Sequence, residues 1–498
     1  MMRSKFAMTQ PTIAGTMMCA QRGLTVVLIT LLALPIVYAG TQELPDLGDE
    51  SAVVMSPHEE RKLGERLMRQ LRGSLRLVDD PEINDYAQFL GHRLVANSDS
   101  ARSNFFFFVI DEPSINAFAL PGGFIGIHAG LILTAQSESE LAAVLAHETA
   151  HVSQRHLARM FAESKRSSKQ LIGALLAAIV LANAGETEGS AATLVLAQAG
   201  LVQKQLNFTR SHEEEADRVG IRILADSGFD PRAMPAFFER LQTWNRLNET
   251  SLPEFLRTHP ITTRRIAESS ARADEYPYKQ VPDSAEFHRV RAKLRASERG
   301  NVATIVEIFK ENLAQGKYRN VHAERYGYTL ALLRFKQYDA ARNEIAKLLR
   351  QDPDSVAYRI LQAEIEIAAE QYKRALDLYT TTAVRFPSNR PLQRYHAAAL
   401  LKTGHAQEAR VLLKQAVKDQ PDDPTLQKML ATAAGEAGER TEAHQALATY
   451  YYLNGDLKAA VEQLTIAQRF TGDSFYLKSS LEARIKEIKK ELAEEKEN

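Results

Sequence analysis

The sequence predicts an α+β domain, mostly helical with a small sheet, followed by an all-α solenoid. Short apolar runs bounded by turn residues mark the strands of the first half, as in "NFFFFVI" at residues 104–110. In the second half, Pro353, Pro387 and Pro421 recur at intervals of 34 residues, which indicates a helical repeat. A chain of 498 residues is too long for one hydrophobic core, so at least two domains are expected.

The N-terminus has the pattern of an export signal. Arg22 precedes an apolar run at residues 26–34, and Val37 and Ala39 supply small or aliphatic residues at the positions that a signal peptidase recognises. The run is short for a membrane-spanning helix, which needs about 20 residues, so cleavage near Ala39 is favoured over an uncleaved anchor. Residues 1–39 are therefore the predicted signal peptide, and residues 40–55 a polar linker.

Composition excludes some classes of protein. The 62 basic and 62 acidic side chains balance, whereas a nucleic-acid-binding protein needs a basic excess or a basic stripe. The only cysteine, Cys19, lies before the apolar run. A mature chain without cysteine is compatible with an oxidising compartment, and it excludes disulfides and thiolate metal ligands.

Residues 56–276 are predicted to form, in order, a helix, a strand, a hairpin and further helices. Ser56 is the expected N-cap of the first helix, because Pro57 takes the first helical position and acids follow in the first turn. The "NFFFFVI" run predicts a buried strand, and "NAFALPGGFIGIHAGLI" predicts a hairpin that turns at residues 121–123. One long helix is expected at residues 138–161.

The second half consists of predicted two-helix units. Alanines recur every 34 residues, at Ala341, Ala375, Ala409 and Ala443. Alanine lets two helices cross closely, and this period is the tetratricopeptide signature. A linker and a degenerate helical pair are expected at residues 277–321, and repeats with capping helices at 322–492. The C-terminal "EARIKEIKKELAEEKEN" predicts a charged, solvated helix that ends in a tail at 493–498.

The stretch "LAAVLAHETAH" contains the pattern H-E-x-x-H. On a helix, His147 and His151 project from the same face, so both rings can bind one metal ion. Glu148 lies next to the first ring, where its carboxylate can accept a proton from a metal-activated water. The pattern also occurs by chance in unrelated chains, and a catalytic zinc needs a third protein ligand.

Acidic residues suited to that third position open another predicted helix. The stretch "SHEEEADRVG" places four acids before a helical apolar spacing: Glu213, Glu214, Glu215 and Asp217. Alone, these acids are equally explained by their favourable interaction with the helix dipole. Their position after an H-E-x-x-H motif favours a metal ligand among them.

Taken in order, "NAFALPGG", "GLI", "LAAVLAHETAH", E-x-x-A-D-x-x-G and "RTHP" resemble the zinc metallopeptidase family that includes HtpX and the CAAX prenyl proteases. The resemblance covers residues 56–276, and the ordered set is far more specific than any one motif. It implies a zincin-type α+β metalloprotease fold that binds one Zn2+ ion per chain. It also implies the zinc ligands His147, His151 and Glu213, with Glu148 as the catalytic base.

Two neighbours of the implied third ligand have separate expectations. Asp217, one turn beyond Glu213, is placed to accept a hydrogen bond from a ligand imidazole. His212, directly beside Glu213, is the alternative ligand. Backbone groups at residues 116–118 or 124–126 are expected to bind an extended substrate as an added strand.

A further histidine lies in the segment "LRTHPITTRRIAE". The matching segment of the relatives lies at the active site, so the resemblance implies a gate in which His259, braced by Pro260, approaches the zinc. There His259 either occupies the fourth coordination position as a latch or stabilises the oxyanion. Arg265 is expected to bind substrate or the acidic helix. The role of His128 stays open, and ordinary surface or core packing is expected for His58, His92, His156, His288, His322, His396, His405 and His444.

An apolar segment separates the two zinc motifs, at residues 171–201. Its first run, "LIGALLAAIVLA", has twelve residues and is too short to cross a bilayer. The segment is expected to form a helical hairpin that packs over the cleft or touches a membrane or a client. An ordinary buried helical pair is the alternative.

With the export signal and the repeats, the resemblance implies a zinc endopeptidase of the Gram-negative periplasm. The expected clients are misassembled outer-membrane β-barrel proteins, including the lipopolysaccharide-transport barrel. The barrel-assembly machinery is the expected docking partner, on the concave face of the repeats. The alternative function is a chaperone or assembly adaptor with a latent protease site. A membrane CAAX-type protease is disfavoured because spanning segments are missing.

Overall fold

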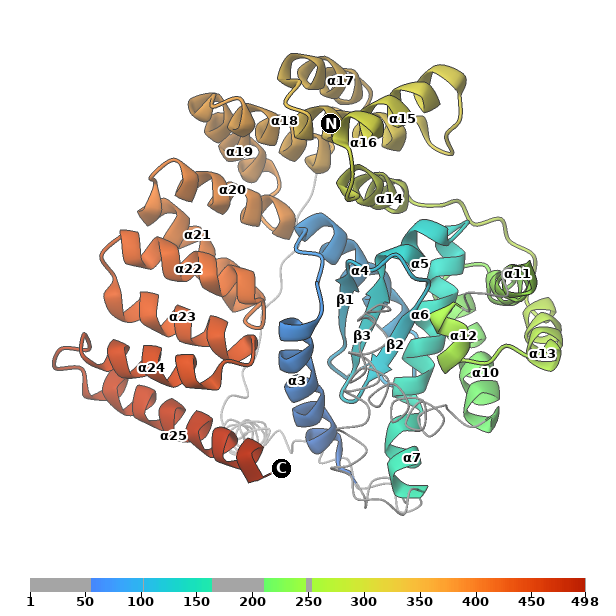
Figure 1. Ribbon diagram of the computed structural model, residues 1–498, viewed down its shortest axis with the longest axis horizontal. Helices are drawn as coiled ribbons and strands as arrows, with labels where there is room; N and C mark the ends of the chain where they lie inside the picture. Colours follow the sequence, from blue (N-terminus) through green and yellow to red (C-terminus); the bar gives the residue numbers. More distant parts are fainter. Residues whose placement is uncertain (1–54, 102, 164–209, 248–252, 498) are drawn as a thin grey trace, which may run out of the picture. The chain divides into compact units, whose positions relative to one another are not determined.

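The computed structural model describes residues 55–101, 103–163, 210–247 and 253–497 (Figure 1). The predicted signal peptide at 1–39, nearly all of the predicted linker at 40–55 and the apolar segment at 171–201 lie outside the described residues. Among those described, no helix is long and apolar enough to cross a membrane.

The N-terminal half begins with two capped helices, α3 (Pro57–Ser74) and α4 (Pro81–Val95). The Ser56 side chain accepts a hydrogen bond from the backbone N–H of Glu59, and the Glu59 carboxylate accepts one from the Ser56 backbone at 2.8 Å. This reciprocal capping satisfies N–H groups that the first turn of a helix leaves unpaired, and it confirms the predicted N-cap.

A three-stranded mixed sheet follows, made of β1 (Phe106–Ile110), β2 (Ala117–Leu120) and β3 (Phe124–His128). The strand order is β1-β3-β2, with β1 parallel and β2 antiparallel to the central strand β3. Gly122 and Gly123 make the turn between β2 and β3 with φ angles of 74° and 87°, which glycine adopts without steric cost. The predicted strand and hairpin are confirmed.

Helices cover both faces of this sheet. Phe107, Val109 and Ile127 point into a core shared with α4 and α6 (Glu138–Ser153). Phe108 and Phe124 point to the opposite face, where they pack with the apolar side of α3. The sheet is therefore the middle layer between α3 on one side and α4 with α6 on the other (Figure 1).

The single helix predicted at 138–161 is wrong at its C-terminal end. The chain forms the short α5 (Ala129–Thr134), then α6, and then a separate helix, α7 (His156–Glu163). Gln154 ends α6, and Arg155 adopts a left-handed φ of 52°. Two guanidinium contacts hold this unusual backbone: Arg155 donates to the Met55 carbonyl and to the Glu60 carboxylate.

Among the described residues, the N-terminal half continues with α10 (Arg210–Asp226), α11 (Ala233–Leu247), α12 (Glu254–Thr258) and α13 (Thr263–Asp274). Helix α10 packs along α6, and Gly220 permits the close approach. A Cβ atom there would lie 3.2 Å from the Cα of His147 and 3.1 Å from the Met234 methyl. The glycine of the E-x-x-A-D-x-x-G pattern thus brings the acidic helix against the H-E-x-x-H helix.

The second half is a series of antiparallel helices, as predicted from the 34-residue period. Ala341, Ala375 and Ala409 are fully buried where helices cross, and Ala443 is half-buried. After α14 (Ala285–Ser297) and α15 (Val302–Gln315), the helices are α16 (Val321–Arg334), α17 (Tyr338–Gln351), α18 (Val356–Ala368), α19 (Tyr372–Arg385), α20 (Arg390–Lys402), α21 (Ala406–Asp419), α22 (Pro424–Glu436), α23 (Arg440–Leu453), α24 (Leu457–Gln468) and α25 (Phe475–Glu497).

The two halves are joined by more than the chain. Phe287 of α14 packs into the same core as α4 and α6. Lys293, also on α14, pairs with Asp80 at 2.9 Å and with Glu82 of α4. At the other end, Arg69 of α3 hydrogen-bonds Tyr452 of α23 and Glu491 of α25.

The C-terminal helix differs from its prediction as a solvated element. Leu481 and Ile488 are buried and pack with α24. Glu491 also binds Arg69 of the N-terminal half, 3.0 Å away. The sequence did not indicate this packing because apolar residues occupy only one narrow stripe of the helix and charged residues occupy the rest.

Candidate metal centre

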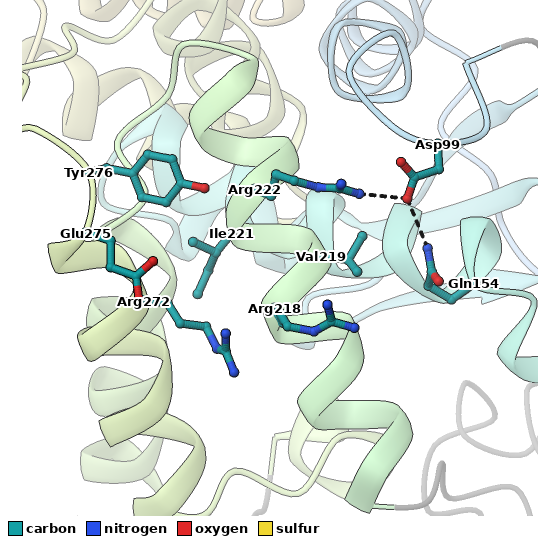
Figure 2. Close-up of a pocket in the computed structure, with 9 residues that line it drawn as sticks. All are labelled: Asp99, Gln154, Arg218, Val219, Ile221, Arg222, Arg272, Glu275 and Tyr276. Atoms are coloured by element: carbon teal, nitrogen blue, oxygen red, sulfur yellow. Dashed lines mark hydrogen bonds and ion pairs between the residues drawn. The ribbon is translucent and has the colours of Figure 1, made fainter.

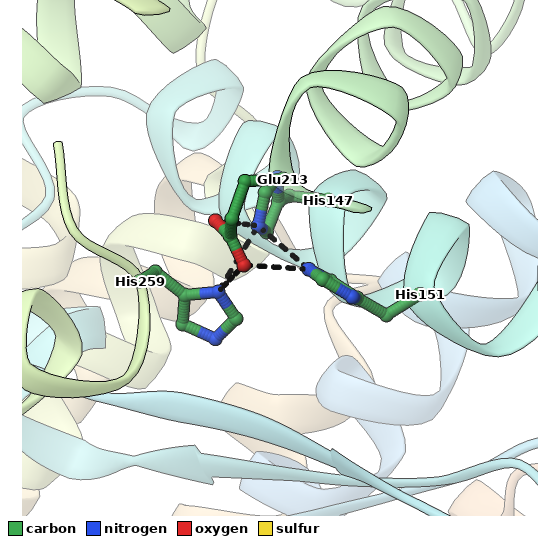
Figure 3. Close-up of side chains that lie close together, drawn as sticks. All are labelled: His147, His151, Glu213 and His259. Carbon is green, nitrogen blue, oxygen red and sulfur yellow. Dashed lines mark hydrogen bonds and ion pairs between the residues drawn. The ribbon is translucent and has the colours of Figure 1, made fainter. Parts of the chain in front are cut away.

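Four side chains converge at the centre of the N-terminal half (Figure 3). His147 and His151 come from α6, Glu213 from the first turn of α10, and His259 from the residue that ends α12. One potential ligand atom of each lies within 4.8 Å of all the others, and all four side chains are buried. Two imidazoles one helical turn apart provide one edge of the site, and tertiary packing provides the other two groups.

The distances within this cluster fit one small cation. The Nε2 atoms of His147 and His151 are 3.0 Å apart, and His147 Nε2 is 3.3 Å from His259 Nδ1. Glu213 Oε1 is 3.5 Å from His151 Nε2 and 2.9 Å from His259 Nδ1. Ligand atoms at about 2.0–2.1 Å from a tetrahedral zinc ion are about 3.3 Å from one another. The observed spacing is close to that edge length.

The buried carboxylates around the cluster also favour binding of a cation. Among the described residues around the cluster, Glu148, Glu213 and Asp217 are buried carboxylates, and the buried guanidinium of Arg265 pairs with Glu213 and Asp217. Buried negative charge is costly unless it is paired or coordinates a metal. Burial would raise the pKa of Glu213, but His259, His147 and His151 hold this pKa well below its usual value. The carboxylate of Glu213 is therefore kept ionised and able to bind a metal ion.

Asp217 and Arg265 form an outer layer behind these groups. Asp217 Oδ1 lies 3.0 Å from His147 Nδ1, the nitrogen that faces away from the cluster. Arg265 binds both oxygens of Asp217 at 2.7 Å and reaches Glu213 Oε2 at 2.7 Å. Burial alone would raise the pKa of Asp217, but the Arg265 guanidinium lowers it. Arg265 thus binds the acidic helix, one of the two roles considered for it.

Glu148 is fully buried beside the cluster and next to β2. Its Oε1 atom is 3.4 Å from His259 Nε2, and its pKa is raised chiefly by burial, against the lowering effect of the nearby histidines. A raised pKa suits a carboxylate that must accept a proton and release it again. Helix α6 contacts β2, so this base lies close to the sheet edge.

The two backbone segments considered for substrate binding differ in whether they lie at an edge of the sheet. β3 is the central strand and pairs with β1 and β2, so residues 124–126 offer no free edge. β2 is an outer strand of the sheet, paired with β3 on one side. The segment at 116–118, which leads into β2, remains the candidate.

The structure shows the contacts of two further histidines near the motifs, His212 and His156. His212 is buried but lies outside the four-residue cluster, and its ring stacks on His156 with centroids 4.6 Å apart. His156 was expected only to pack, yet its Nδ1 atom is 2.9 Å from Nδ1 of His151. Sequence reasoning missed this contact, because the break after α6 turns the chain back and gives no helical spacing to recognise.

His128, whose role the sequence left open, belongs to a separate buried group. Its Nδ1 atom is 2.7 Å from the Ser114 hydroxyl, which donates to Glu254 at 3.2 Å. Burial lowers the pKa of His128 to about 4 and raises that of Glu254 to about 7. Glu254 begins α12, the helix that ends at His259, so this group attaches α12 to the sheet.

A separate cavity of about 320 Å³ lies between α10, α13 and the end of α6 (Figure 2). Arg218, Arg222 and Arg272 line it, and Asp99 accepts hydrogen bonds from Arg222 at 2.7 Å and from Gln154 at 3.4 Å. None of the four cluster residues lines this cavity. It is therefore not the opening of the candidate metal centre.

Comparison with known proteins gives two family matches. The model of peptidase family M48 matches residues 81–273, and a tetratricopeptide repeat model matches residues 366–433. The beta-barrel assembly-enhancing protease of Escherichia coli strain K12 is 34% identical over 446 residues, covering 90% of this chain and 91% of the relative. The protein of the same name from Yersinia pestis is 32% identical over 450 residues, covering 90% and 92%. The mitochondrial metalloendopeptidase OMA1 of Arabidopsis thaliana is 34% identical over 157 residues, covering 32% and 29%.

Proposed function

The chain belongs to peptidase family M48, among the beta-barrel assembly-enhancing proteases, and from this we propose how it acts. We propose that it is a periplasmic zinc endopeptidase that degrades misassembled outer-membrane β-barrel proteins and assists correctly assembling ones. The observation that carries the proposal is the buried cluster of His147, His151 and Glu213 with Glu148 beside it.

The three ligands we propose for zinc are His147, His151 and Glu213. Two imidazole nitrogens and one carboxylate, with a fourth position for water or substrate, are the usual donor set of a catalytic zinc ion. Zinc bound there supplies a Lewis acid that acidifies water and polarises a peptide carbonyl. Asp217 orients His147 from behind, and Arg265 holds both Asp217 and Glu213 in place.

Glu148 is the proposed general base. Its carboxylate takes the proton of the attacking water and then delivers it to the leaving amine. Burial raises its pKa, which brings proton uptake and release closer in energy at neutral pH. An extended client segment added to the outer edge of β2 would be held largely through its backbone, and this accounts for a weak sequence preference.

His259 is the proposed latch of this site. Its Nδ1 atom is 3.3 Å from His147 Nε2 and 2.9 Å from Glu213 Oε1, so the ring occupies the remaining side of the cluster. A fourth protein ligand would make a closed tetrahedron of the structural type. Movement of α12 would then be needed before water or a substrate carbonyl can enter.

The repeats are the proposed binding region for the barrel-assembly machinery and for clients, which include the lipopolysaccharide-transport barrel. Stacked helical repeats offer an extended concave surface for such partners. The relatives that match most of this chain are named for β-barrel assembly. A periplasmic address follows from that role and from the export signal predicted at residues 1–39.

The catalytic proposal is tested by metal content and cleavage of casein, an unfolded model substrate. Wild-type protein should contain one zinc ion per chain and cleave casein, whereas Glu148→Gln should keep the zinc and lose cleavage by at least about 10²-fold. Equal cleavage by both proteins would contradict the role of Glu148. Full zinc occupancy without cleavage by either wild type or His259→Ala would instead favour the adaptor with a latent site.

The proposed role of the repeats is tested by a deletion that spares the protease core. The cut is placed before Glu298, because Phe287 of α14 belongs to that core. The shortened protein should retain zinc, which controls for folding of the protease half. It should lose association with barrel-assembly components in the cell, and undiminished association would contradict the proposal.

A further inference from the structure

A chain of hydrogen bonds leads away from the second histidine of the H-E-x-x-H motif. His151 Nδ1 lies 2.9 Å from His156 Nδ1, and His156 Nε2 lies 3.2 Å from Glu215 Oε2. Arg159 Nη1 donates to the same carboxylate oxygen at 2.8 Å. The residues come from α6, α7 and α10, and the two rings are almost completely buried. Ordinary packing of histidine does not require three successive contacts of this length.

The direction of these hydrogen bonds follows from the metal site. His151 directs Nε2 into the cluster, 3.0 Å from His147 Nε2, and that nitrogen must offer its lone pair to bind a metal. Its proton therefore resides on Nδ1 and is donated to Nδ1 of His156. His156 then carries its own proton on Nε2 and donates it to Glu215. This assignment of neutral rings satisfies the contacts from His151 to His156 and from His156 to Glu215, since a neutral imidazole has one donor and one acceptor nitrogen.

The backbone around His156 is shaped to make this contact. The left-handed Arg155, with φ of 52°, ends the path of α6 and turns the next residue back toward His151. The His156 ring then stacks on His212, with centroids 4.6 Å apart and planes 23° from parallel. A left-handed conformation is uncommon outside glycine and asparagine and costs about 1 kcal/mol or more. The fold accepts that cost where it fixes one imidazole against another.

We propose that His156 is a positioning residue for the metal ligand His151, with Glu215 and Arg159 holding His156 in turn. This inference rests on the proposed zinc site. The two imidazole ligands are then oriented by different groups: His147 directly by the carboxylate of Asp217, and His151 by a neutral imidazole that relays to the carboxylate of Glu215. Partners behind a ligand fix its ring orientation and tautomer, and their removal typically lowers metal affinity about 10–100-fold.

The test compares two substitutions of His156 in the full-length protein. Phenylalanine keeps a planar ring to stack on His212 but removes both nitrogens. Asparagine is smaller, but its Oδ1 atom can take the place of Nδ1 and accept the proton of His151. Zinc affinity is measured by competition with a chromophoric chelator. The visible spectrum of the Co2+-substituted protein reports the ligand geometry, and circular dichroism of the metal-free protein controls for folding.

His156→Phe should bind zinc about 10–100-fold more weakly than wild type, with a changed Co2+ spectrum and unchanged secondary structure. His156→Asn should restore most of the affinity and the wild-type spectrum. His212→Phe, which keeps the stacked ring without touching His151, should bind zinc as wild type does.

Wild-type zinc affinity in His156→Phe would overturn the inference. Equal weakening in the phenylalanine and asparagine variants would also overturn it, because packing alone would then explain the loss. A wild-type protein that binds no zinc would refute the proposed metal site itself, so the two failures are distinguishable.

Discussion

The metal centre buries mainly charged and polar side chains, whereas the crossing points of the repeat helices bury mainly apolar ones. Around the metal centre, carboxylates, imidazoles and a guanidinium are withdrawn from water and held within hydrogen-bonding distance of one another. In the repeats, the crossing points bury alanines such as Ala375 and Ala409, and most ion pairs lie near the surface. One region concentrates charge where a folded protein normally excludes it, and the other follows ordinary packing.

This difference shows where the structure serves chemistry at the expense of stability. Burying ionised groups costs several kcal/mol each unless they are paired, so a fold keeps them only where every partner is in place. Helical repeats need only that apolar surfaces of neighbouring units match. Substitutions in the centre should therefore change metal binding and activity, and those in the repeats should change stability.

The largest effect is expected from the ligands themselves. His147→Ala, His151→Ala and Glu213→Ala should each abolish stoichiometric zinc, because each removes one of the three ligands proposed for a catalytic zinc ion. Elemental analysis of the purified proteins measures this loss. The matched control is Glu214→Ala, because Glu214 contacts Arg264 at 3.5 Å and lies outside the cluster. Full zinc in Glu213→Ala and loss in Glu214→Ala would show that the assigned register is wrong.

Lys293 tests whether a buried ion pair between the two halves is as costly to break as the buried charges at the metal centre are expected to be. Burial would lower its pKa, but Glu82 and other neighbours raise it well above the usual value, so the ammonium stays charged. Lys293→Ala removes the ammonium that neutralises the carboxylates of Asp80 and Glu82 and should cost about 3–5 kcal/mol of unfolding free energy, measured by urea denaturation. Lys310→Ala is the control, because its ion pair with Glu307 is exposed and worth less than about 1 kcal/mol. Equal costs would contradict the prediction.

The repeat packing is tested by overfilling one crossing point. Ala409 has no exposed surface, and Ala409→Leu should destabilise the protein by about 1–3 kcal/mol because a packed interior has no room for the added carbons. Val411→Leu, two positions away at a side chain that is 62% exposed, should change stability by less than about 0.5 kcal/mol. Denaturation curves give both values, and zinc content should be unaffected in each. A neutral Ala409→Leu would mean that the repeats are loosely packed.

Glu254 tests the group that attaches α12 to the sheet. Its pKa is raised from 4.5 to about 7, chiefly by burial. The folded protein therefore favours the protonated form of Glu254. The contribution of this group to the free energy of unfolding is fully present below pH 4.5, and it is lost as the pH rises from 4.5 through about 7. Each pKa unit is worth about 1.4 kcal/mol, so wild type should lose on the order of 2 kcal/mol relative to Glu254→Gln between pH 5 and 8. Denaturation at both pH values measures it, and a constant difference would contradict the assignment.

The smallest effect is expected from opening the latch. His259→Ala should retain zinc and cleave casein several-fold faster than wild type, because the ring no longer occupies the fourth side of the cluster. If His259 stabilises the oxyanion instead, the same substitution should lower turnover by about 10²–10³-fold. Initial rates of cleavage at equal zinc content decide between them, and a large loss would disprove the latch.

The sequence determined the features that depend on short-range spacing. The 34-residue period, the cap at Ser56, the double-glycine turn at 122–123 and the placement of His147 and His151 on one helical face are all local. Each follows from the dihedral preferences of a few consecutive residues or from the 3.6-residue turn of the helix. These features gave the α+β and repeat classes directly, and the ordered motifs gave the family.

Local spacing did not decide which of several neighbouring groups faces the centre; the family resemblance implied Glu213, and tertiary packing brings this carboxylate into the cluster. Glu213, Glu214 and Glu215 have the same side chain and adjacent positions. Glu213 nevertheless lies in the cluster, Glu214 contacts Arg264, and Glu215 contacts His156. Helix α10 points each carboxylate about 100° from the last, so the outcome depends on its rotation against α6, which Gly220 helps to set. The contact from His156 to His151 likewise needed the left-handed break at Arg155. Such choices depend on how distant elements pack, because local spacing carries no information about the partner surface.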